Sequence, residues 1–338
     1  MSHQPLFRKY VVVFVVLVSG ALTTSGLLQA FFAYQENQAA LGALQHEKAA
    51  SAAGRIAEFI DEVERLVAGA LSAPTTPDGV RPEQRRNDFL RLIRQVPSIM
   101  EVSYLDHDGR EQVRISRLDL NVIGSQTDRA HDDVFVSARQ GATYYGPVYF
   151  QNASEPYMIL GVPERGSGGG VIVAEVNLKF IWDVVAQIRV GQAGFAYVVD
   201  NAGQLVAHPD ISLVLRRADL SALPQVQVLD SAPPAVGGGA SIGRDLQARA
   251  VLTAREPIRS LGWWVFVEQP LEEAFAPLAA SLVRTAILLI VGLGLSVLAS
   301  LVLARRMVTP IRALQAGAAR VGAGGLDQRI DVHTGDEL

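Results

Sequence analysis

The chain has 338 residues, with 30 lysines and arginines against 34 aspartates and glutamates, so its formal net charge is −4. This near balance, without a long basic run, argues against nucleic acid as the partner. The chain has no cysteine, which excludes disulfides, thiol catalysis and cysteine-ligated metal, and its hydrophobic content of 49% is high for a soluble protein.

The N-terminal region contains an apolar run long enough to cross a membrane. Tyr10–Phe32 carries no charge and directly follows an Arg-Lys pair. About 20 apolar helical residues span a hydrocarbon core of ~30 Å, and flanking positive charges mark the cytoplasmic side. We therefore predict a cytoplasmic N-terminus over residues 1–9 and a first transmembrane helix over residues 10–33. The alternative is a cleaved signal peptide with Val11–Val18 as its apolar core.

A second apolar run lies near the other end of the chain. Thr285–Leu303 is uncharged, and as a helix it would rise roughly 28 Å. Arg305 and Arg306 follow it, so the same charge rule predicts a second transmembrane helix over residues 281–303. Both ends of the chain are then cytoplasmic, and residues 34–280 lie outside.

Helical patterns follow the first apolar run. From Tyr34 to about Ser72, apolar residues recur at helical spacing, and the proline-containing segment Pro74–Gly79 ends the pattern. We predict one long helix here and a shorter one over Glu83–Gln95. A further helix, over Lys179–Arg189, is expected to join two regions of strand-like sequence.

These two regions share one pattern. Glu101–Ser116 and Gly194–Pro209 each hold two alternating apolar runs around an Asp-x-x-Gly turn, which is typical of a hairpin. The turn residues Asp106 and Asp200 are 94 positions apart. Further strand-like runs follow at Tyr144–Phe150, Tyr157–Val162, Val171–Leu178, Ala248–Glu256 and Trp263–Gln269. The predicted fold class is α+β, with two tandem antiparallel-sheet units that share the long helix.

This arrangement resembles the double Cache sensor domain of bacterial transmembrane receptors. The most specific stretch is Gly191–Asp210, and Leu261–Leu271 resembles the end of the second unit. The resemblance implies two PAS-like units, about residues 75–190 and 191–271, in the periplasmic part of a two-pass inner-membrane protein. It also implies that ligand binds in the first, membrane-distal unit.

Residues 304–338 are similar to the first part of a HAMP domain, a parallel coiled-coil relay. Pro310 stands near the start of its helix, where a missing N–H is tolerated. The residues that resemble the apolar seam, the connector and the opening of the second helix are Ile311, Leu314, Ala318, Val321, Leu326, Ile330 and Glu337. Half of a HAMP domain cannot close its four-helix bundle, so we expect these residues to belong to a longer receptor that acts as a homodimer.

The resemblance implies a receptor that senses an extracytoplasmic small molecule and relays the signal to an output beyond Leu338. We expect a histidine kinase of a two-component system. The alternatives are a nucleotide cyclase, a cyclic-di-GMP enzyme, a chemotaxis signalling rod, or a module that binds a periplasmic protein. The six histidines show neither HxxxH nor HExxH spacing, so we expect no catalytic residue, metal site or cofactor within these residues. His208 is interpreted as a turn residue.

A candidate ligand site is predicted in the first unit. Amino-acid-sensing Cache domains carry an Arg with a Trp-Tyr for the ligand carboxylate, and a Tyr-x-Asp with a later Asp for the ammonium. Arg129 falls near the Arg position and Glu175 at the later acidic one, but both aromatic motifs are missing, so a conventional α-amino acid is not expected.

We instead predict Arg129 as an anion clamp for an organic acid or another carboxylate. The tyrosines expected to line the pocket are Tyr144, Tyr145, Tyr149 and Tyr157. The alternative is that these tyrosines are ordinary strand residues and that Arg129 is solvated. Glu175 interrupts an apolar run, and a buried carboxylate there needs a partner.

Overall fold

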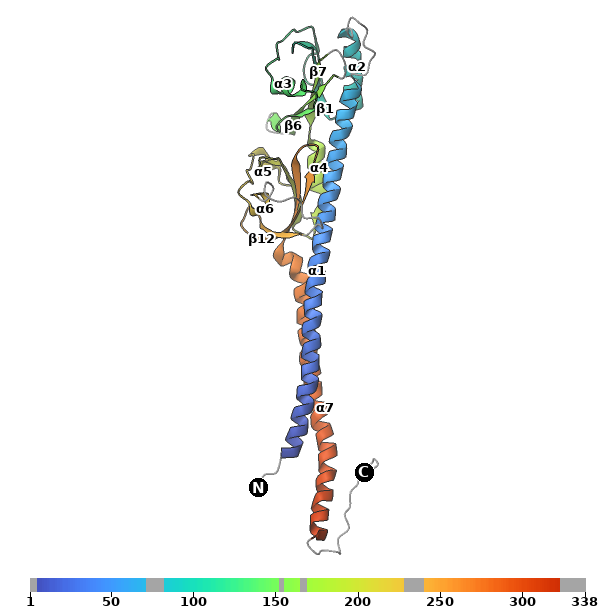
Figure 1. Cartoon of the computed structure of the whole chain (residues 1–338), viewed down its shortest axis with the longest axis vertical. Helices are drawn as coiled ribbons and strands as arrows, with labels where there is room; N and C mark the ends of the chain where they lie inside the picture. Colours follow the sequence, from blue (N-terminus) through green and yellow to red (C-terminus); the bar gives the residue numbers. More distant parts are fainter. Residues whose placement is uncertain (1–4, 71–81, 152–154, 165–168, 228–239, 323–338) are drawn as a thin grey trace. The chain divides into compact units, whose positions relative to one another are not determined.

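The computed structural model describes residues 5–70, 82–151, 155–164, 169–227 and 240–322 (Figure 1). The chain divides into two compact units. The helical unit comprises residues 1–38 and 275–338, and the sheet unit comprises residues 39–274. Helix α1, Pro5–Gly69, contributes residues to both units.

The helical unit contains two antiparallel helices, the first part of α1 and most of α7, Leu271–Gly322. Tyr34 stacks on Phe275 with ring centroids 5.8 Å apart, and Gly26 lies against Leu289 further along the pair. Many large apolar side chains of both helices stay exposed, among them Leu17, Leu28, Leu288 and Ile290. Both helices are long and apolar enough to cross a membrane. A helix that is apolar on all sides is typical of a membrane span.

In the sheet unit, α1 and α2, Pro82–Gln95, present apolar faces to the core. On α1 the residues Ile56, Ile60 and Val63 recur at helical spacing and are at most 3% exposed. Phe89, Leu92 and Ile93 of α2 are also buried. The predictions of a long helix and of a shorter helix over residues 83–95 are confirmed, and the proline-containing segment predicted to end the first lies outside the described residues.

The first sheet has the strand order β3-β2-β1-β7-β6-β4, with β5 also paired to β6. Its strands are β1 Ile99–Leu105, β2 Glu111–Ser116, β3 Val122–Ile123, β4 Tyr144–Tyr145, β5 Tyr149–Gln151, β6 Glu155–Pro163 and β7 Val171–Asn177. Neighbouring strands are antiparallel. Helix α3, Asp133–Ala138, packs on one face of this sheet, and α1 and α2 pack on the other.

Helix α4, Lys179–Gln187, leads into the second sheet, whose order is β10-β9-β13-β12-β11 with β8 also paired to β9. Its strands are β8 Arg189–Val190, β9 Gly194–Val199, β10 Leu205–Ala207, β11 Ser241–Arg244, β12 Ala250–Ile258 and β13 Trp263–Pro270. The short helices α5, Ile211–Leu215, and α6, Pro224–Gln227, follow β10 in the chain. Within the sheet unit the two sheets lie one after the other along α1 (Figure 1).

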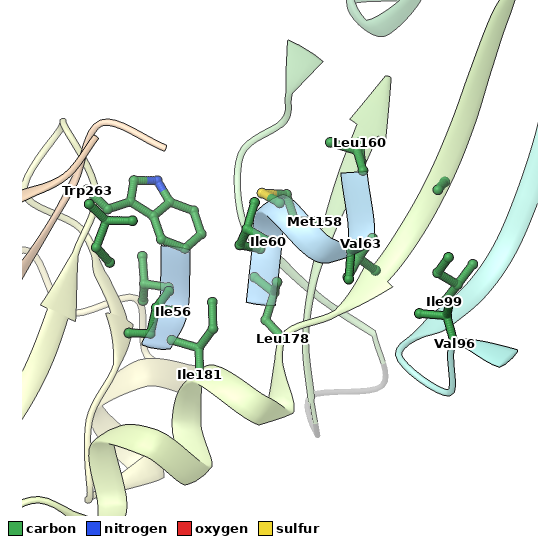
Figure 2. Packing of buried hydrophobic residues seen from close by; sticks show 14 of the residues in the cluster. Ile56, Ile60, Val63, Val96, Ile99, Met158, Leu160, Leu178, Ile181 and Trp263 are labelled. Atoms are coloured by element: carbon green, nitrogen blue, oxygen red, sulfur yellow. The ribbon is translucent and has the colours of Figure 1, made fainter. Parts of the chain in front are cut away.

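One continuous core joins the two sheets to α1. Figure 2 shows Ile56 of α1 beside Ile181 and Trp263, and Ile60 near Met158. These residues belong to a single cluster of buried side chains that draws on both sheets, α1, α2 and α4. The cluster explains the position of α1, because one helix covers the inner face of both sheets.

The predicted α+β fold with two sheets and a long helix is confirmed, and both hairpins and the joining helix form where they were predicted. One difference is the run over residues 144–150, which is divided into β4 and β5. Gly146 and Pro147 interrupt it, because proline has no N–H for the strand ladder.

Candidate functional site

Each sheet begins with a hairpin whose turn determines which side chains share a face. Asp106 and Asp200 each accept two backbone N–H groups with one carboxylate oxygen, at 2.8 to 3.0 Å. Gly109 and Gly203 have φ angles of 78° and 80°, in the left-handed region that favours glycine. The turns hold the first two strands in register, and side chains alternate between the two faces from there.

The first sheet has one apolar face and one face that is polar at one end. On β7, Ile172, Ala174 and Val176 join the core shared with α1, whereas Val171 and Val173 pack with α3. We call the second side the α3 face. Alternation places Glu175 on it, and its half-exposed carboxylate lies beyond the apolar cluster around α3.

Two glutamates and a tyrosine meet at the polar end of the α3 face. Glu101 on β1 is the register partner of Glu175 on β7, and Tyr149 on β5 donates its hydroxyl to Glu175. Burial raises the pKa of Glu101; the nearby Arg114 lowers it, and the charge of Glu175 raises it further. Burial and Glu175 also raise the pKa of Tyr149, so its hydroxyl stays a donor at neutral pH. Adjacent carboxylates repel each other, and a shared cation relieves the repulsion.

A row of charges continues from this end along β2. Glu111 is 4% exposed, and its two carboxylate oxygens lie 3.7 Å from Nε of Arg114 and 3.8 Å from Nη1 of Arg129. Arg129 also donates from Nε to Asp132 at 2.7 Å. The predicted anion clamp therefore already has two carboxylate neighbours. Nε of Arg114, in contrast, is buried without a hydrogen-bond partner in the part of the chain that the structure describes.

The four predicted tyrosines fall on two sides of the sheet. Tyr149 and Tyr157 lie together on the α3 face, with ring centroids 6.1 Å apart, and Tyr144 packs partly against the cluster around α3. Tyr145 packs against the opposite core and donates its hydroxyl to Glu64 of α1 at 2.6 Å. The structure thus brings three of the tyrosines to the face of Glu175 and places Tyr145 as a link between β4 and the long helix.

Sequence reasoning missed Glu101 and Arg114. The signal was present, since the hairpin register places Ser116 opposite Glu101 and Arg114 opposite Ser103, so all four share one face. The pairing of Glu101 with Glu175 required more, because β1 and β7 are neighbours only through the strand order of the folded sheet.

Two further groups of polar side chains lie in turns. Asp106, His107 and Asp108 bring ligand-type atoms within 4.8 Å of one another, but the last two are exposed and Asp106 accepts the backbone N–H groups of its own turn. The turn accounts for this group without an ion. His208 accepts the backbone N–H of Asp210 with Nδ1 at 2.9 Å, as a turn residue does.

The predicted relay residues are only partly described. Those that belong to α7 are Pro310, Ile311, Leu314, Ala318 and Val321. A helix over this segment is confirmed, but Pro310 lies inside the continuous helix α7 and not near the start of a helix, so that part of the prediction is wrong. The role of the segment as a relay stays a prediction. The others, Leu326, Ile330 and Glu337, lie outside the described residues.

Comparison with known families agrees with this architecture. The dCache_1 family model, described as a Cache domain, matches residues 33–278, and a model described as a HAMP domain matches residues 302–338.

Among curated proteins, the chain is 22% identical over 216 residues to methyl-accepting chemotaxis protein TlpB of Bacillus subtilis, covering 60% of this chain and 29% of TlpB. It is 27% identical over 199 residues to methyl-accepting chemotaxis protein McpG of Pseudomonas putida, covering 55% of this chain and 30% of McpG. The chain thus spans less than a third of the length of these relatives.

Solved structures show the same fold. The extracellular domain of mmHK1S-Z2, a protein assigned as a histidine kinase, aligns with a TM-score of 0.56 at 15% identity, over 72% of this chain and 99% of that one. The ligand-binding domain of the amino-acid chemoreceptor PctC of Pseudomonas aeruginosa, in complex with GABA, aligns with a TM-score of 0.51 at 16% identity, over 66% of this chain and 97% of that one. The corresponding domain of PctB with L-Arg aligns with a TM-score of 0.51 at 20% identity, over 71% and 92%.

Proposed function

The chain belongs to the Cache domain family, and from this premise we propose that it is the sensor part of a two-pass inner-membrane receptor. Its sheet unit would lie in the periplasm, with spans over residues 10–33 and 281–303. Two helices of suitable length and composition support this topology. Positive charges before the first span and after the second support a cytoplasmic location for both ends. Alkaline phosphatase fused after residue 150 would be active, and a cytoplasmic reporter active at that position would overturn the topology.

The ligand of this receptor, in our proposal, is a small compound with an amino group that binds the α3 face of the first sheet. The observation that carries this is the Glu101–Glu175 pair, with the Tyr149 hydroxyl beside it. Two adjacent carboxylates in a partly buried place favour an ammonium group as their shared counter-ion. The similar ligand-binding domains solved in complex with GABA and with L-Arg support the same class of ligand.

The other end of the row suits a carboxylate. Arg114 has a buried Nε without a hydrogen-bond partner among the described residues, and Arg129 is within 4 Å of Glu111 and Asp132. An anionic group of the ligand would give Arg114 that partner, and a guanidinium binds carboxylates through two parallel hydrogen bonds. A compound with both charges would therefore satisfy both ends of the row, which retains the predicted carboxylate as one end of the ligand.

The test is isothermal titration of the full chain in lipid nanodiscs with GABA and L-arginine. Glu175→Gln should weaken binding at least tenfold, because it removes the charge that holds the ammonium. Arg91→Gln is the matched control for Arg129→Gln, because Arg91 is a solvent-exposed arginine of α2 with 73% of its side chain accessible. Binding of organic acids alone, lost in Arg129→Gln and kept in Glu175→Gln, would reject the amino compound in favour of the simple anion clamp.

Signal transfer between the two sheets has a candidate contact in β5. Tyr149 touches Glu175, and the next residue, Phe150, packs against the outer cluster of the second sheet, which contains Tyr197 and Phe266. A ligand that moves Tyr149 would also shift the contact of Phe150, and it can bias the receptor only by its differential affinity for the two states. Ligand should change hydrogen exchange in β9 and β13 in the wild type but not in Phe150→Ala. A change in the variant as large as that in the wild type would reject this route.

Two outputs are supported for the whole protein. The curated relatives favour a chemotaxis signalling rod, and mmHK1S-Z2 favours a histidine kinase, the output first expected. Autophosphorylation of the full-length protein from ATP would identify a kinase, whereas ligand-dependent control of a separate kinase would identify a chemoreceptor.

A homodimer is proposed from the heptad spacing after the second span. Because the chain has no cysteine, single cysteines report on proximity without interference. Ala318→Cys in the predicted seam should cross-link in membranes under mild oxidation, and Ala316→Cys, on the opposite side of the heptad, should not. Equal cross-linking of both variants would contradict the parallel seam.

A further inference from the structure

The second sheet carries a cavity of about 220 Å³ on the face that points away from α1. Its walls include Phe195, Tyr197, His208, Leu223, Asp245 and Glu268. Pockets for drug-sized ligands measure about 300–1,000 Å³, so an occupant of this cavity would be a smaller molecule.

Glu268 occupies the place in the second sheet that Glu175 occupies in the first. Glu175 pairs with Glu101 on the first strand of its hairpin, and Glu268 pairs with Phe195 on the first strand of the other. Phe195 follows Glu101 by 94 positions, the same interval that separates the two turn aspartates. A tyrosine hydroxyl also meets each carboxylate, from Tyr149 in the first sheet and from Tyr197 in the second.

Glu268 is a buried carboxylate with no counter-ion among the residues that the structure describes. It is 2% exposed, and both of its hydrogen bonds end on Oε1, from the Tyr197 hydroxyl at 2.5 Å and from Nε2 of Gln225 at 2.9 Å. Oε2 accepts no hydrogen bond from any residue that the structure describes. The charge that acts on Glu268 is a second acid, Asp245. Burial of an unpaired carboxylate is unfavourable, and an added cation relieves it.

The remaining walls do not supply that cation. Arg249 donates from Nε to Asp245 at 2.7 Å, so these two charges offset each other. Burial lowers the pKa of His208, which leaves its imidazole neutral at pH 7 and above. Asp210 adds a further negative charge at the rim. With Glu268 ionised, the cavity therefore has an excess of negative charge.

The apolar walls favour an organic cation over an inorganic one. Phe195 and His208 meet edge to face with ring centroids 4.9 Å apart, and Tyr197 stacks on Phe266 at 5.2 Å. Aromatic rings attract ammonium groups and pack well against their carbon substituents. A hydrated metal ion, in contrast, would seek several oxygen ligands.

We propose that this cavity is a second ligand site of the protein and binds a small organic amine. The ammonium would bind Oε2 of Glu268, and its carbon atoms would pack against Phe195 and Leu223. This site is separate from the α3 face of the first sheet, and it requires neither the ligand nor the output proposed for the receptor.

The probe is n-propylamine, titrated by calorimetry into the full chain in lipid nanodiscs at pH 8, with propionate as the anionic control. Propylamine should bind and propionate should not. Glu268→Gln should weaken propylamine binding at least tenfold, and Glu58→Gln, at an exposed place on α1, should change it less than twofold. Leu223→Trp, which fills the cavity and keeps the carboxylate, should also abolish binding. Thermal melting of each variant confirms that it is folded.

The pH dependence gives an independent readout. Burial raises the pKa of Glu268 to about 7, while propylamine stays protonated well above this range. Affinity should therefore rise roughly tenfold between pH 6 and pH 8 as Glu268 ionises. The polar and charged groups that surround the Glu268 carboxylate in the cavity are Tyr197, Gln225, His208, Asp210 and the Asp245–Arg249 pair.

Three results would overturn the proposal: propylamine binding retained in Glu268→Gln, affinity that falls as pH rises, or binding lost in Glu175→Gln alone. The last result would assign the amine to the α3 face and would thereby support the ligand class proposed there. If Glu175→Gln loses GABA binding and keeps propylamine binding, the two ligands bind at different sites, as the two proposals together require.

Discussion

The two sheets carry a glutamate at the same place in their registers, yet the two carboxylates have different neighbours. Glu175 has Glu101 beside it on the adjacent strand and is half exposed at the end of a charged row. Glu268 has Phe195 at that position and is buried in the wall of a cavity. The strand register thus gives both glutamates the same position in their sheets. The residue on the neighbouring strand then decides whether the glutamate lies in a row of charged side chains, as Glu175 does, or among aromatic rings, as Glu268 does.

The same comparison separates two kinds of ligand. A row with acids at one end and arginines at the other suits a compound with two opposite charges. A small cavity with a buried carboxylate that has no counter-ion among the described residues suits a compound with a single positive charge and a short apolar body. If both proposals hold, the two sheets of this chain bind two different classes of ligand.

The largest expected effect tests whether the two sheets are energetically separate. Ile56→Ala removes a buried side chain from the core shared by both sheets (Figure 2) and should destabilise the sheet unit by about 2–5 kcal/mol. Amide exchange should rise in β7 and β13 together. Glu58→Ala, at an exposed place on the same helix, should change stability by less than about 0.5 kcal/mol. Faster exchange confined to one sheet would show that each sheet has a core of its own.

The second prediction uses pH to test the burial of Glu268 in the second sheet. Burial raises the folded-state pKa of Glu268 to about 7, above the ordinary value of 4.5. Its contribution to stability is therefore fully present below pH 4.5 and is lost as pH rises through 7.

We expect thermal melting of the wild type minus that of Glu268→Gln to decrease between pH 5 and pH 8, by on the order of 2–3 kcal/mol in free energy. A flat difference for Glu268→Gln would mean that the carboxylate is solvated or has a cationic partner in solution.

The smallest effects come from the two tyrosines that donate to these acids. Tyr197→Phe leaves a 2%-exposed carboxylate with one donor fewer and should destabilise the protein by about 1–3 kcal/mol at pH 8. Tyr149→Phe should have a smaller effect, below about 1 kcal/mol, since water reaches the half-exposed Glu175. Urea denaturation of both variants measures the two losses in free energy of unfolding. A larger loss for Tyr149→Phe than for Tyr197→Phe would contradict the inference that Glu268 is the more buried of the two carboxylates.

Part of the candidate site was accessible from sequence. Glu175 stood out because a carboxylate interrupts an apolar run, and Tyr149 and Tyr157 stood out because tyrosines are concentrated there. The direction of Tyr145 could not be read in the same way, since it depends on where β4 lies on the sheet and on Glu64 of α1, which is 81 positions away. The carboxylate neighbours of Arg129 likewise depend on how its loop folds back over β2.

The sequence by itself determined the two long apolar helices, the amphipathic helices and the two Asp-x-x-Gly hairpins. These features depend on composition, periodicity and turn chemistry between residues close in the chain. Only the tertiary structure decided that Glu101 meets Glu175, that Glu268 lines a cavity and that one core serves both sheets. Those outcomes follow from strand order and from the packing of both sheets against α1, which bring together residues far apart in the chain.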